Sequence, residues 1–507
     1  MNQQAPSTAS ERIPIAPSPL PRATIWDTLL SAWHSRRLFA FILLALAVVL
    51  GGFYRFHRLA RWDINGDEGV AWAAVTKPSL HEVVKTFWQV EYGGKLPLFD
   101  IVLHGWVRVF GDSLFAMRAM SAALGTIAIV LLFLAVREIS RSLVDEAATE
   151  IGELAGAFAA LIYALNITTL ISDRTAREFP VLIGAELLQI IFFVRAQRRP
   201  AWADYLGIVI FTAVMLADNY SSSFLVLAEA SWLGCLLAAK WAGSTRARRL
   251  AVFRPGFAVL AGMALLAPFV SEAYVSSRDA VAGGAVDFMK LQPISWPFTV
   301  LRDEFHEPAL FWVAAALIAF GVWRQSRSAR LASGFLAVWT AGPVLAAFAI
   351  SYLIRPIEIP RYVIVAFVGM FAFAGFGAAC VRSTAVRILL AIMIVGLSVP
   401  TVHRLLKVSR SGDWRKATAL AVKHISPGEQ IAVFLPYSQQ VVKFYLPRER
   451  RTAAVAMDTN ATETNCGTAP VLIFQNQTKA PPAQIAAVKA CYPRVIAKLN
   501  LIEVRTR

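Results

Sequence analysis

Long apolar runs recur along most of this chain and are separated by short stretches that carry most of its charge. A membrane-spanning helix needs about 20 predominantly apolar residues, so runs of this length predict a bundle of spanning helices. We expect eleven of them, at residues 38–56, 114–136, 152–171, 178–195, 203–218, 221–240, 256–275, 308–324, 331–354, 361–381 and 385–402. The predicted fold class is therefore an all-α polytopic membrane protein.

One apolar run, Pro97–Phe110, is too short to span a bilayer and carries three polar groups. Asp100, His104 and Arg108 recur at intervals of four residues, which places them on one face of a helix. This pattern is typical of a helix that lies in the membrane interface. We therefore expect the helix to belong to a long external loop over residues 57–112.

With that helix kept outside, the basic residues between the predicted spans all fall on one side. Cytoplasmic loops are enriched in Lys and Arg. The cytoplasmic side then receives Arg137, Arg141, Arg195, Arg198, Arg199, Lys240, Arg246, Arg248, Arg249, Arg324, Arg327, Arg330, Arg382 and Arg387. Residues 1–37, which contain five prolines, are expected to form a disordered cytoplasmic leader. The acidic stretch after the first span and the C-terminus lie outside.

The composition agrees with a membrane protein and argues against a nucleic-acid-binding one. The 507 residues are 57% hydrophobic and 16% charged, with a mean hydropathy of +0.55. The net charge of +17 comes from clusters between apolar runs, which suits membrane topology and anionic head groups. Of four cysteines, Cys235 and Cys380 lie in apolar runs. Cys466 and Cys491 could pair if their region faces an oxidising compartment.

Beyond the last predicted span, shorter elements alternate. We expect helices over 414–424 and 482–490 and strands over 430–435, 471–474 and 495–501. Asp413 stands at the N-terminus of the first of these helices, where a negative charge is favourable. The alternation predicts a small external α/β domain over residues 409–507, following a transmembrane domain over residues 38–408.

An acidic pair, Asp67 and Glu68, stands just beyond the first predicted span. Acidic pairs are common on solvated surfaces, but uncompensated acid at a membrane boundary is expensive and tends to be functional. On a helix, successive side chains point about 100° apart, so the two carboxylates can hardly address the same atom. One could act as a general base on an acceptor hydroxyl or hold a metal, while the other orients a neighbour.

Other ionisable residues on the predicted external side suit a phosphate-activated donor. Arg174 and Arg177 lie three residues apart, which suits phosphate binding, although snorkelling at a helix end is the alternative. Asp173 could be a second oxygen ligand for a hard divalent cation, or could pair with either arginine. Arg361 begins an apolar run on the side where basic residues are unusual. Lys95 could reach a phosphate from a rigid turn.

Five segments carry a family resemblance: INGDEGVAWAA, KLPLFDIVLHGWVRVFGDSLFAMRAMSAALG, ALIYALNITTLISDRTAREF, PRYVIVAFVGMFA and SGDWRKATALAVKHISPGEQIAVF. In this order, over most of residues 38–450, they resemble the membrane-embedded glycosyltransferases of the GT-C class. The resemblance is to the bacterial branch similar to protein O-mannosyltransferases and the lipid A aminoarabinose transferase. It implies a sugar taken from a polyprenyl monophosphate carrier on the external side.

The resemblance also assigns roles to residues. The acidic residue of the family's first loop, a proposed base or metal partner, corresponds to Asp67, with Glu68 as its support. The family's second external acid corresponds to Asp173. Asp67 and Asp173 are accordingly the candidate ligands of a divalent cation, Mg²⁺ or Mn²⁺.

The family's phosphate contacts have counterparts as well. The lysine of a K-P turn corresponds to Lys95, although Leu96 intervenes here before the proline. An Arg-Tyr pair at the start of a late span corresponds to Arg361 and Tyr362. Together with Arg174 and Arg177, these residues are the expected contacts of the donor phosphate.

The expected function is an inverting transfer of a sugar from polyprenyl phosphate to lipid A, lipopolysaccharide, another envelope glycan or a protein. The chain would lie in a bacterial inner membrane, with the site and the C-terminus periplasmic, and no nucleic-acid partner is expected. The alternatives are a lipid or sugar transporter or flippase, and a non-catalytic envelope scaffold. No internal repeat is apparent and polar groups concentrate at one membrane face, which favours the enzyme over the transporter.

Overall fold

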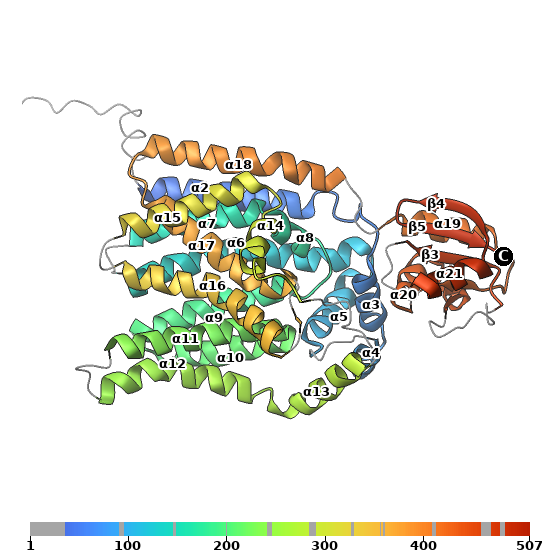
Figure 1. Cartoon of the computed structure of the whole chain (residues 1–507), viewed down its shortest axis with the longest axis horizontal. Coiled ribbons are helices and arrows are strands. Elements are labelled where there is room, and N and C mark those ends of the chain that lie inside the picture. The colour runs from blue at the N-terminus through green and yellow to red at the C-terminus, as the bar shows by residue number, and fades with distance from the viewer. Residues whose placement is uncertain are drawn as a thin grey trace, which may run out of the picture.

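The computed structural model is a bundle of long helices with a small mixed domain at one end (Figure 1). It describes residues 36–90, 96–144, 149–198, 200–240, 246–282, 291–325, 329–354, 356–357, 360–407, 412–434, 436–457, 468–476 and 482–507. Almost all of the predicted leader lies outside these residues, and so do Lys95 and Cys466.

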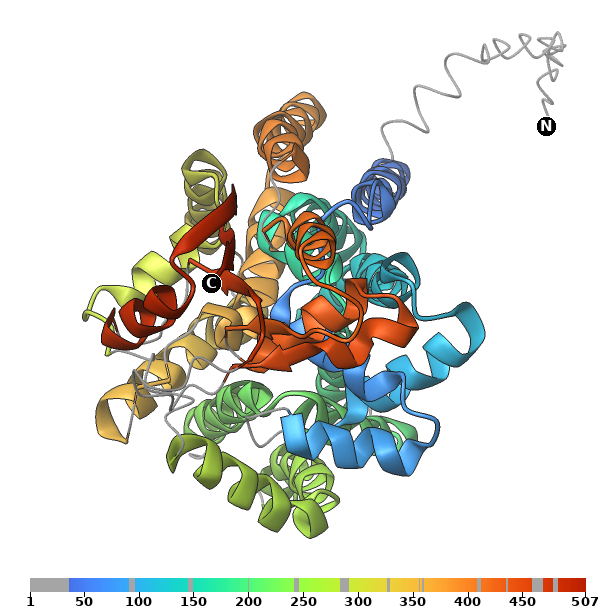
Figure 2. The same ribbon diagram turned by 90° about the vertical axis from the view of Figure 1, so that its right-hand side faces the viewer.

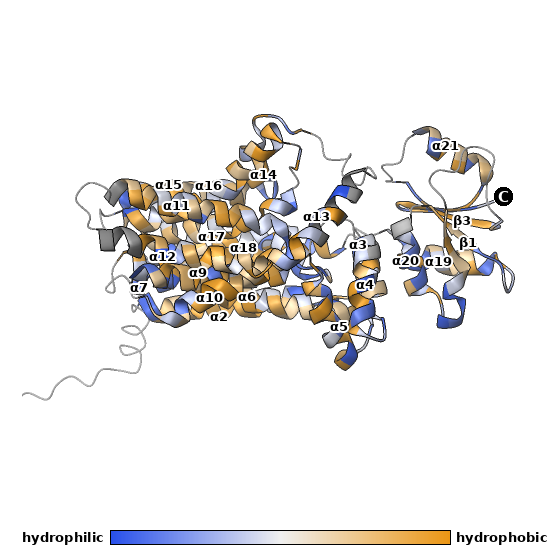
Figure 3. Cartoon of the chain, turned by 90° about the horizontal axis from the view of Figure 1, so that it is seen from below, coloured by the Kyte–Doolittle hydropathy of each residue, from blue (hydrophilic) through white to orange (hydrophobic). Residues whose placement is uncertain are grey.

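Within these ranges, seven helices are long and apolar enough to cross a membrane, and two bent pairs raise the number to nine. The seven are α2 (Arg36–Phe56), α6 (Leu114–Leu143), α9 (Phe179–Arg198), η2–α11 (Tyr220–Ser222 and Ser223–Lys240), α16 (Arg330–Leu353), η3–α17 (Pro360–Val363 and Ile364–Ala379) and α18 (Thr384–Lys407). The bent pairs are α7–α8 (Thr149–Leu165 and Ile167–Asp173) and α14–α15 (Trp296–Asp303 and Pro308–Arg324). Figure 3 shows hydrophobic residues throughout this bundle. The chain is a multi-pass membrane protein.

The predicted number of eleven spans is not confirmed. α10 (Trp202–Asp218) has only 17 residues, and the predicted span 256–275 is divided between α12 (Arg246–Ala264) and α13 (Ala267–Ala282). The predicted span 152–171 is also broken, with α7 and α8 bent by 66°. The break occurs because Asn166 caps a new helix: its Oδ1 accepts a hydrogen bond of 3.2 Å from Thr169 N. Run length alone does not reveal such a cap.

The helix α17 lies at the centre of the bundle, with 94% of its most apolar window buried. Two of its glycines allow neighbouring helices to approach closely. A Cβ on Gly375 would lie 2.3 Å from the carbonyl oxygen of Ala155 in α7, and one on Gly377 would overlap the Leu317 carbonyl in α15. Small residues serve the same purpose at many membrane helix interfaces.

Three shorter helices, α3 (Gly66–Val75), α4 (Leu80–Val90) and α5 (Leu98–Phe110), form a lobe at one end of the bundle (Figure 1). α5 has 13 residues and is not among the spanning helices, as predicted. Its polar residues do not share an exposed face, however. Arg108 is exposed, Asp100 is buried, and Nδ1 of His104 lies 2.7 Å from the carbonyl oxygen of Val75.

The C-terminal domain contains a five-stranded sheet in the order β2-β1-β3-β5-β4. β1 pairs in parallel with β2 and β3, while β5 pairs antiparallel with β3 and β4. Its elements are α19 (Trp414–Lys423), β1 (Ile431–Val433), α20 (Pro436–Tyr445), η4 (Arg448–Ala453), β2 (Ala454–Ala456), β3 (Val471–Gln475), α21 (Pro482–Cys491), β4 (Arg494–Leu499) and β5 (Ile502–Thr506). The predicted helices and strands are present; α20, β2 and β5 were not predicted.

One hydrophobic cluster joins this domain to the lobe. It includes Ile64, Trp72, Val75, Phe99, Leu103, Trp414, Ala421, Val441, Leu446 and Val504. Trp72 of α3 meets Phe444 of α20 edge to face, with ring centroids 5.4 Å apart. A Cβ on Gly69 would lie 3.0 Å from Cγ2 of Val441. Figure 2, viewed from the domain, shows its orange helices beside the blue helices of the lobe. The C-terminal domain therefore fixes the position of α3.

Candidate active site

The acidic pair stands in the first turn of α3, whose N-terminus has a reciprocal cap. Asn65 Oδ1 accepts a hydrogen bond of 2.9 Å from Glu68 N, and Glu68 Oε2 accepts one of 3.1 Å from Asn65 N. This arrangement satisfies two backbone donors at the helix start. The cap also fixes the start of the helix, and the two acidic side chains point into different surroundings. The Asp67 side chain is 55% exposed, whereas that of Glu68 is 0% exposed.

Glu68 is part of a buried ion pair. Nε and Nη2 of Arg118 donate hydrogen bonds of 2.7 Å to its two carboxylate oxygens, and the Ala176 amide donates a third of 2.9 Å. Arg118 also donates to the carbonyl oxygens of Leu59, Trp62 and Asp63. The Glu68 carboxylate and the Arg118 guanidinium are both buried, and their polar atoms are occupied by these hydrogen bonds. Glu68 therefore holds the loop between α2 and α3 and does not reach the cavity beside it.

Asp67 faces a cavity of about 570 Å³ at the lobe end of the bundle. The cavity is lined by Asn65, Asp67, Thr168, Ile171, Ser172, Thr175, Arg177, Phe179, Glu304, His306, Pro360, Arg361 and Ile364. Asp67 Oδ2 lies 3.9 Å from Nη2 of Arg177 and 3.6 Å from Nη1 of Arg361. The structure thus brings together one predicted base and two predicted phosphate contacts from three separate segments.

Arg177 is held in place by a buried carboxylate. Glu178 Oε2 lies 2.9 Å from Nε of Arg177, and Oε1 accepts a hydrogen bond of 3.2 Å from its Nη2. Asn219 Nδ2 donates to the same carboxylate at 3.5 Å. The Arg177 side chain is only 11% exposed, so its guanidinium is oriented before any ligand arrives.

Arg361 is more accessible than Arg177 and stands over the ring of Tyr362. Its side chain is 44% exposed, and its guanidinium carbon lies 5.6 Å from the centroid of the Tyr362 ring. Tyr362 in turn contacts Tyr220, with centroids 5.6 Å apart. An exposed guanidinium at the rim of the cavity is free to turn its planar fork toward an anion. Elsewhere in the cavity lining, Thr168 Oγ1 donates a hydrogen bond of 2.6 Å to Oε2 of Glu304.

Asp173 does not line this cavity. Its side chain is 0% exposed, and Oδ2 lies 2.8 Å from Nε and 2.7 Å from Nη2 of Arg55. The neighbouring helix contributes Gly125, on which a Cβ would lie 2.3 Å from the same oxygen. The partner of Asp173 is therefore Arg55 of α2, and neither of the adjacent arginines that its sequence position suggested.

Arg174 is buried as well, with 1% exposure. Its guanidinium donates to carbonyl oxygens at the end of α2, those of Tyr54, Arg55, His57 and Arg58, and lies 5.0 Å from the Trp62 ring centroid. Burial, with the charges of Arg118 and Arg55, lowers the pKa of Arg174 to about 10. It stays protonated at neutral pH and neutralises a helix C-terminus. Arg174 and Arg177 therefore do not form a joint phosphate site.

The C-terminal domain holds the residues just before α3. The Tyr445 hydroxyl accepts a hydrogen bond of 2.9 Å from Ile64 N, and Asp63 Oδ2 accepts one of 2.9 Å from Arg415 N. Burial, with the Asp63 carboxylate, raises the pKa of Tyr445 to about 12. The phenol thus remains neutral at physiological pH, and the support of Asp67 extends into the far end of the chain.

The described residues do not fit a divalent metal bound by Asp67 and Asp173. Asp173 is occupied by Arg55, and the neighbours of Asp67 are two guanidinium groups, which would repel a cation. In the ranges given above there is no group of three His, Cys, Asp or Glu side chains placed to hold a metal. We therefore derive no chemical step through a metal.

The sequence interpretation missed the two arginines that bind the acids. Arg55 and Arg118 both stand in predominantly apolar stretches. A charge in such a stretch is expensive unless it is paired, and this cost was the available signal for buried ion pairs. Thr168 in the cavity wall offered no comparable signal.

Solved structures share this fold. ArnT from Cupriavidus metallidurans in the apo state is 14% identical, with a TM-score of 0.59 over 94% of this chain and 98% of that one. The structure of the same protein bound to undecaprenyl phosphate is 14% identical, with a TM-score of 0.56 over 92% of this chain and 97% of that one. The Archaeoglobus fulgidus oligosaccharyltransferase in complex with Zn and sulfate is 11% identical, with a TM-score of 0.57 over 86% of this chain and 68% of that one.

These neighbours have the fold of the GT-C class of membrane glycosyltransferases, and the present chain has it too. No protein-family model matches the sequence. No curated protein matches it either.

Proposed function

We propose that this chain is a membrane glycosyltransferase that takes a sugar from a polyprenyl monophosphate carrier and passes it to an acceptor hydroxyl. The observation that carries the proposal is the place of Asp67, an exposed carboxylate between the guanidinium groups of Arg177 and Arg361 in a cavity at the end of a membrane bundle. A general base can take the proton of the acceptor hydroxyl, and two cations can stabilise the departing phosphate. The neighbour ArnT, which was solved with undecaprenyl phosphate, supports the class of donor.

The donor phosphate binds Arg361 at the rim and Arg177 in the wall. Both cations lie within 4 Å of Asp67, so an incoming phosphate competes with Asp67 for them. Once the phosphate takes these contacts, the Asp67 carboxylate is released from both guanidinium groups and can accept a hydrogen bond from the acceptor hydroxyl. Donor binding and activation of the base are in this way linked.

In the chemical step, the acceptor oxygen forms a bond to the anomeric carbon while the bond from that carbon to the phosphate oxygen breaks. Attack from the face opposite the phosphate inverts the configuration. The acceptor proton passes to Asp67, and the bonding pair leaves with polyprenyl phosphate, whose charge the two arginines stabilise. No other co-reactant is needed.

The proposed acceptors are lipid A, lipopolysaccharide, another envelope glycan or a protein on the periplasmic face of a bacterial inner membrane. Two observations support this orientation. Cys491 in the C-terminal domain is disulfide-bonded, which is typical of an oxidising compartment. Arginines at the last turns of α6, α9 and α15 lie at the other end of the bundle, as expected for a cytoplasmic side.

The test uses the full chain in proteoliposomes, supplied with undecaprenyl phosphate bearing radiolabelled glucose, mannose or an aminopentose, and with purified lipopolysaccharide. We expect label to move to the acceptor with the wild-type chain. The variant Asp67→Asn should be at least about 100-fold slower, the lower end of what a general base contributes, and should still bind undecaprenyl phosphate. Full activity of Asp67→Asn would refute its role as base. Movement of the labelled donor across the vesicle membrane without transfer would show a transporter.

A further inference from the structure

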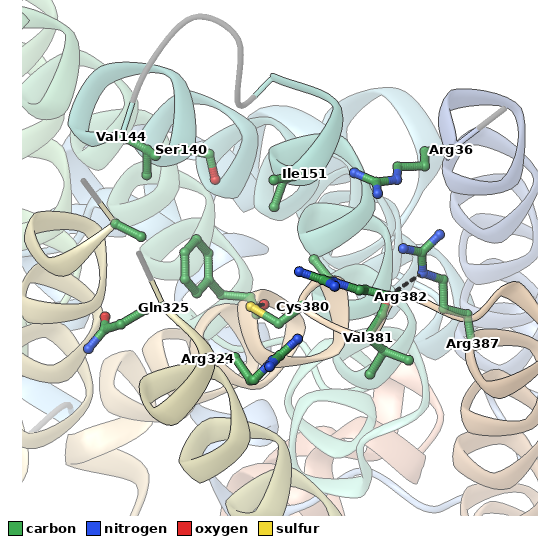
Figure 4. Close-up of a pocket in the computed structure, with 13 residues that line it drawn as sticks. Arg36, Ser140, Val144, Ile151, Arg324, Gln325, Cys380, Val381, Arg382 and Arg387 are labelled. Carbon is green, nitrogen blue, oxygen red and sulfur yellow. Dashed lines mark hydrogen bonds between the residues drawn. The ribbon is translucent and has the colours of Figure 1, made fainter. Parts of the chain in front are cut away.

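A second cavity, of about 230 Å³, is drawn in close-up in Figure 4. The helix ends that form it lie at the opposite end of the bundle from α3, the helix that carries Asp67 (Figure 1). Its walls come from the ends of six helices, α2, α6, α7, α15, α17 and α18, and from their connections. They include four arginines: Arg36, Arg324, Arg382 and Arg387. Figure 4 shows Arg36, Arg382 and Arg387 on one side of the pocket and Arg324 below Cys380, with Ile151 above. Nothing in the transfer reaction described above uses them.

The four arginines lack carboxylate partners among the residues that the structure describes. Other basic residues at this end are paired: Arg37 lies 3.4 Å from Glu153, and Arg137 lies 3.5 Å from the same side chain. Acidic groups are thus available nearby, yet none lies within 4.0 Å of a guanidinium in the cavity wall. The cavity therefore concentrates uncompensated positive charge.

Burial of Arg387 makes this uncompensated positive charge energetically unfavourable. The residue is only 3% exposed, and the hydrogen bond from its Nε goes to a neutral acceptor, the carbonyl oxygen of Val381, at 2.8 Å. A buried cation without a counter-ion costs several kcal/mol. Snorkelling accounts for the exposed arginines at a helix end, but it does not account for a buried one. An anion in the cavity would supply the missing charge.

We propose that this cavity binds a phosphate ester, and that its source is the head group of an anionic phospholipid in the leaflet on this side. Arginine forks match phosphate oxygens in pairs, and basic pockets between spanning helices commonly hold anionic head groups. The volume is below the roughly 300–1,000 Å³ of drug-sized ligand sites, which suits a small head group whose chains remain in the bilayer. Val144, Ile151 and Phe376 supply apolar wall beside the arginines.

The test measures which lipids the purified full chain retains. Native mass spectrometry in mild detergent follows binding of phosphatidylglycerol and of phosphatidylcholine with the same acyl chains. We expect the wild-type chain to prefer phosphatidylglycerol. The double variant Arg36→Gln/Arg382→Gln should lose about 100-fold in affinity for it, because each charge-assisted hydrogen bond contributes about a factor of ten. Arg330→Gln is the matched control, since Arg330 is exposed at the same end and is not in the cavity wall.

A second measurement places the lipid and does not depend on lipid preference elsewhere on the surface. Cys380 lines the cavity and is a free thiol, so N-ethylmaleimide should modify it more slowly when phosphatidylglycerol is bound. The other free thiol, Cys235, is removed by Cys235→Ser. We expect protection in this background and in Arg330→Gln, and none in Arg36→Gln/Arg382→Gln.

Four outcomes decide the proposal. Equal retention of the two lipids by the wild-type chain, or retention unchanged in the double variant, would overturn it. So would a Cys380 thiol that phosphatidylglycerol does not protect. If inorganic phosphate protects Cys380 as well as the lipid does at equal concentration, the site takes a soluble phosphate compound, and the lipid source is rejected. Folding of each variant is checked by thermal unfolding.

Discussion

Arg118 and Glu68 form a two-point ion pair in which Nε and Nη2 of the arginine each donate a 2.7 Å hydrogen bond to a different carboxylate oxygen. Both side chains are buried. The next residue back along the helix, Asp67, is exposed to a cavity. Two neighbouring acids thus have separate tasks, since one fixes the loop and the other faces the space where a substrate would bind.

Glu68→Gln should destabilise the fold while Asp67→Asn should not. Replacing one member of a buried ion pair leaves the other charge uncompensated, and such changes cost about 3–5 kcal/mol. Removal of an exposed charge usually changes stability by less than about 0.5 kcal/mol. Thermal unfolding of both variants in the same detergent gives the comparison. Equal unfolding temperatures for the two would contradict the division of tasks.

Arg361→Gln should weaken donor binding more than it slows the chemical step. Its guanidinium stands at the rim with 44% exposure, so loss of one charge-assisted contact should raise KM for the polyprenyl donor about tenfold. Arg404→Gln is the control, because Arg404 is 74% exposed and lies beside Glu307. Steady-state transfer at varied donor concentration measures both constants. An unchanged KM in Arg361→Gln would remove Arg361 from the donor site.

Gly125→Ala should disrupt the buried pair of Asp173 and Arg55. The new Cβ would lie 2.3 Å from Asp173 Oδ2, and overpacking of this kind costs about 1–3 kcal/mol. Gly52→Ala is the matched control in α2, where the nearest side-chain atom is 3.6 Å away. There the gain in helix propensity should leave stability equal or higher. Unfolding temperatures that rise in both variants would show that the pair tolerates the methyl group.

Tyr445→Phe should reduce transfer as well as stability. The change leaves Ile64 N without its acceptor, and a buried donor left unsatisfied costs about 1–3 kcal/mol. The loosened segment leads directly into α3 and Asp67. Tyr492→Phe is the control, because its hydroxyl bonds to Ala469 O within the same domain and lies outside the lobe. Stability should fall in both variants, and kcat only in Tyr445→Phe. Equal kcat values would show that the domain does not position the base.

Residue patterns were sufficient to predict the membrane bundle, the lobe helix α5 and most of the C-terminal elements. These features depend on apolar run length and periodicity, which are local properties. The pattern also placed Asp67 at the membrane boundary, next to cations. The predicted number of eleven spans is not confirmed, because caps such as Asn166 break a run that is apolar throughout.

The roles of the individual charged residues could not be predicted in the same way. Asp67 and Glu68 are neighbours, and what separates them is Arg118, which lies 50 residues beyond Glu68. Asp173 has arginines beside it in the sequence, yet its partner Arg55 is 118 residues away. In both cases the ion pair that decides the role of the acid joins two different helices. Spacing along one helix therefore carries no information about it.

The hydrogen bond from Ile64 to Tyr445 spans 381 residues, and it therefore sets an order of events during biosynthesis. At about 5–20 residues per second, the ribosome needs roughly 20 to 80 s to make the second partner after the first. During that interval Trp72 and Val75 have no α20 or α19 to pack against. A nascent chain thus carries its Asp67 segment without these contacts until α20 has been made, and a chain that stops before Tyr445 lacks the hydrogen bond to Ile64.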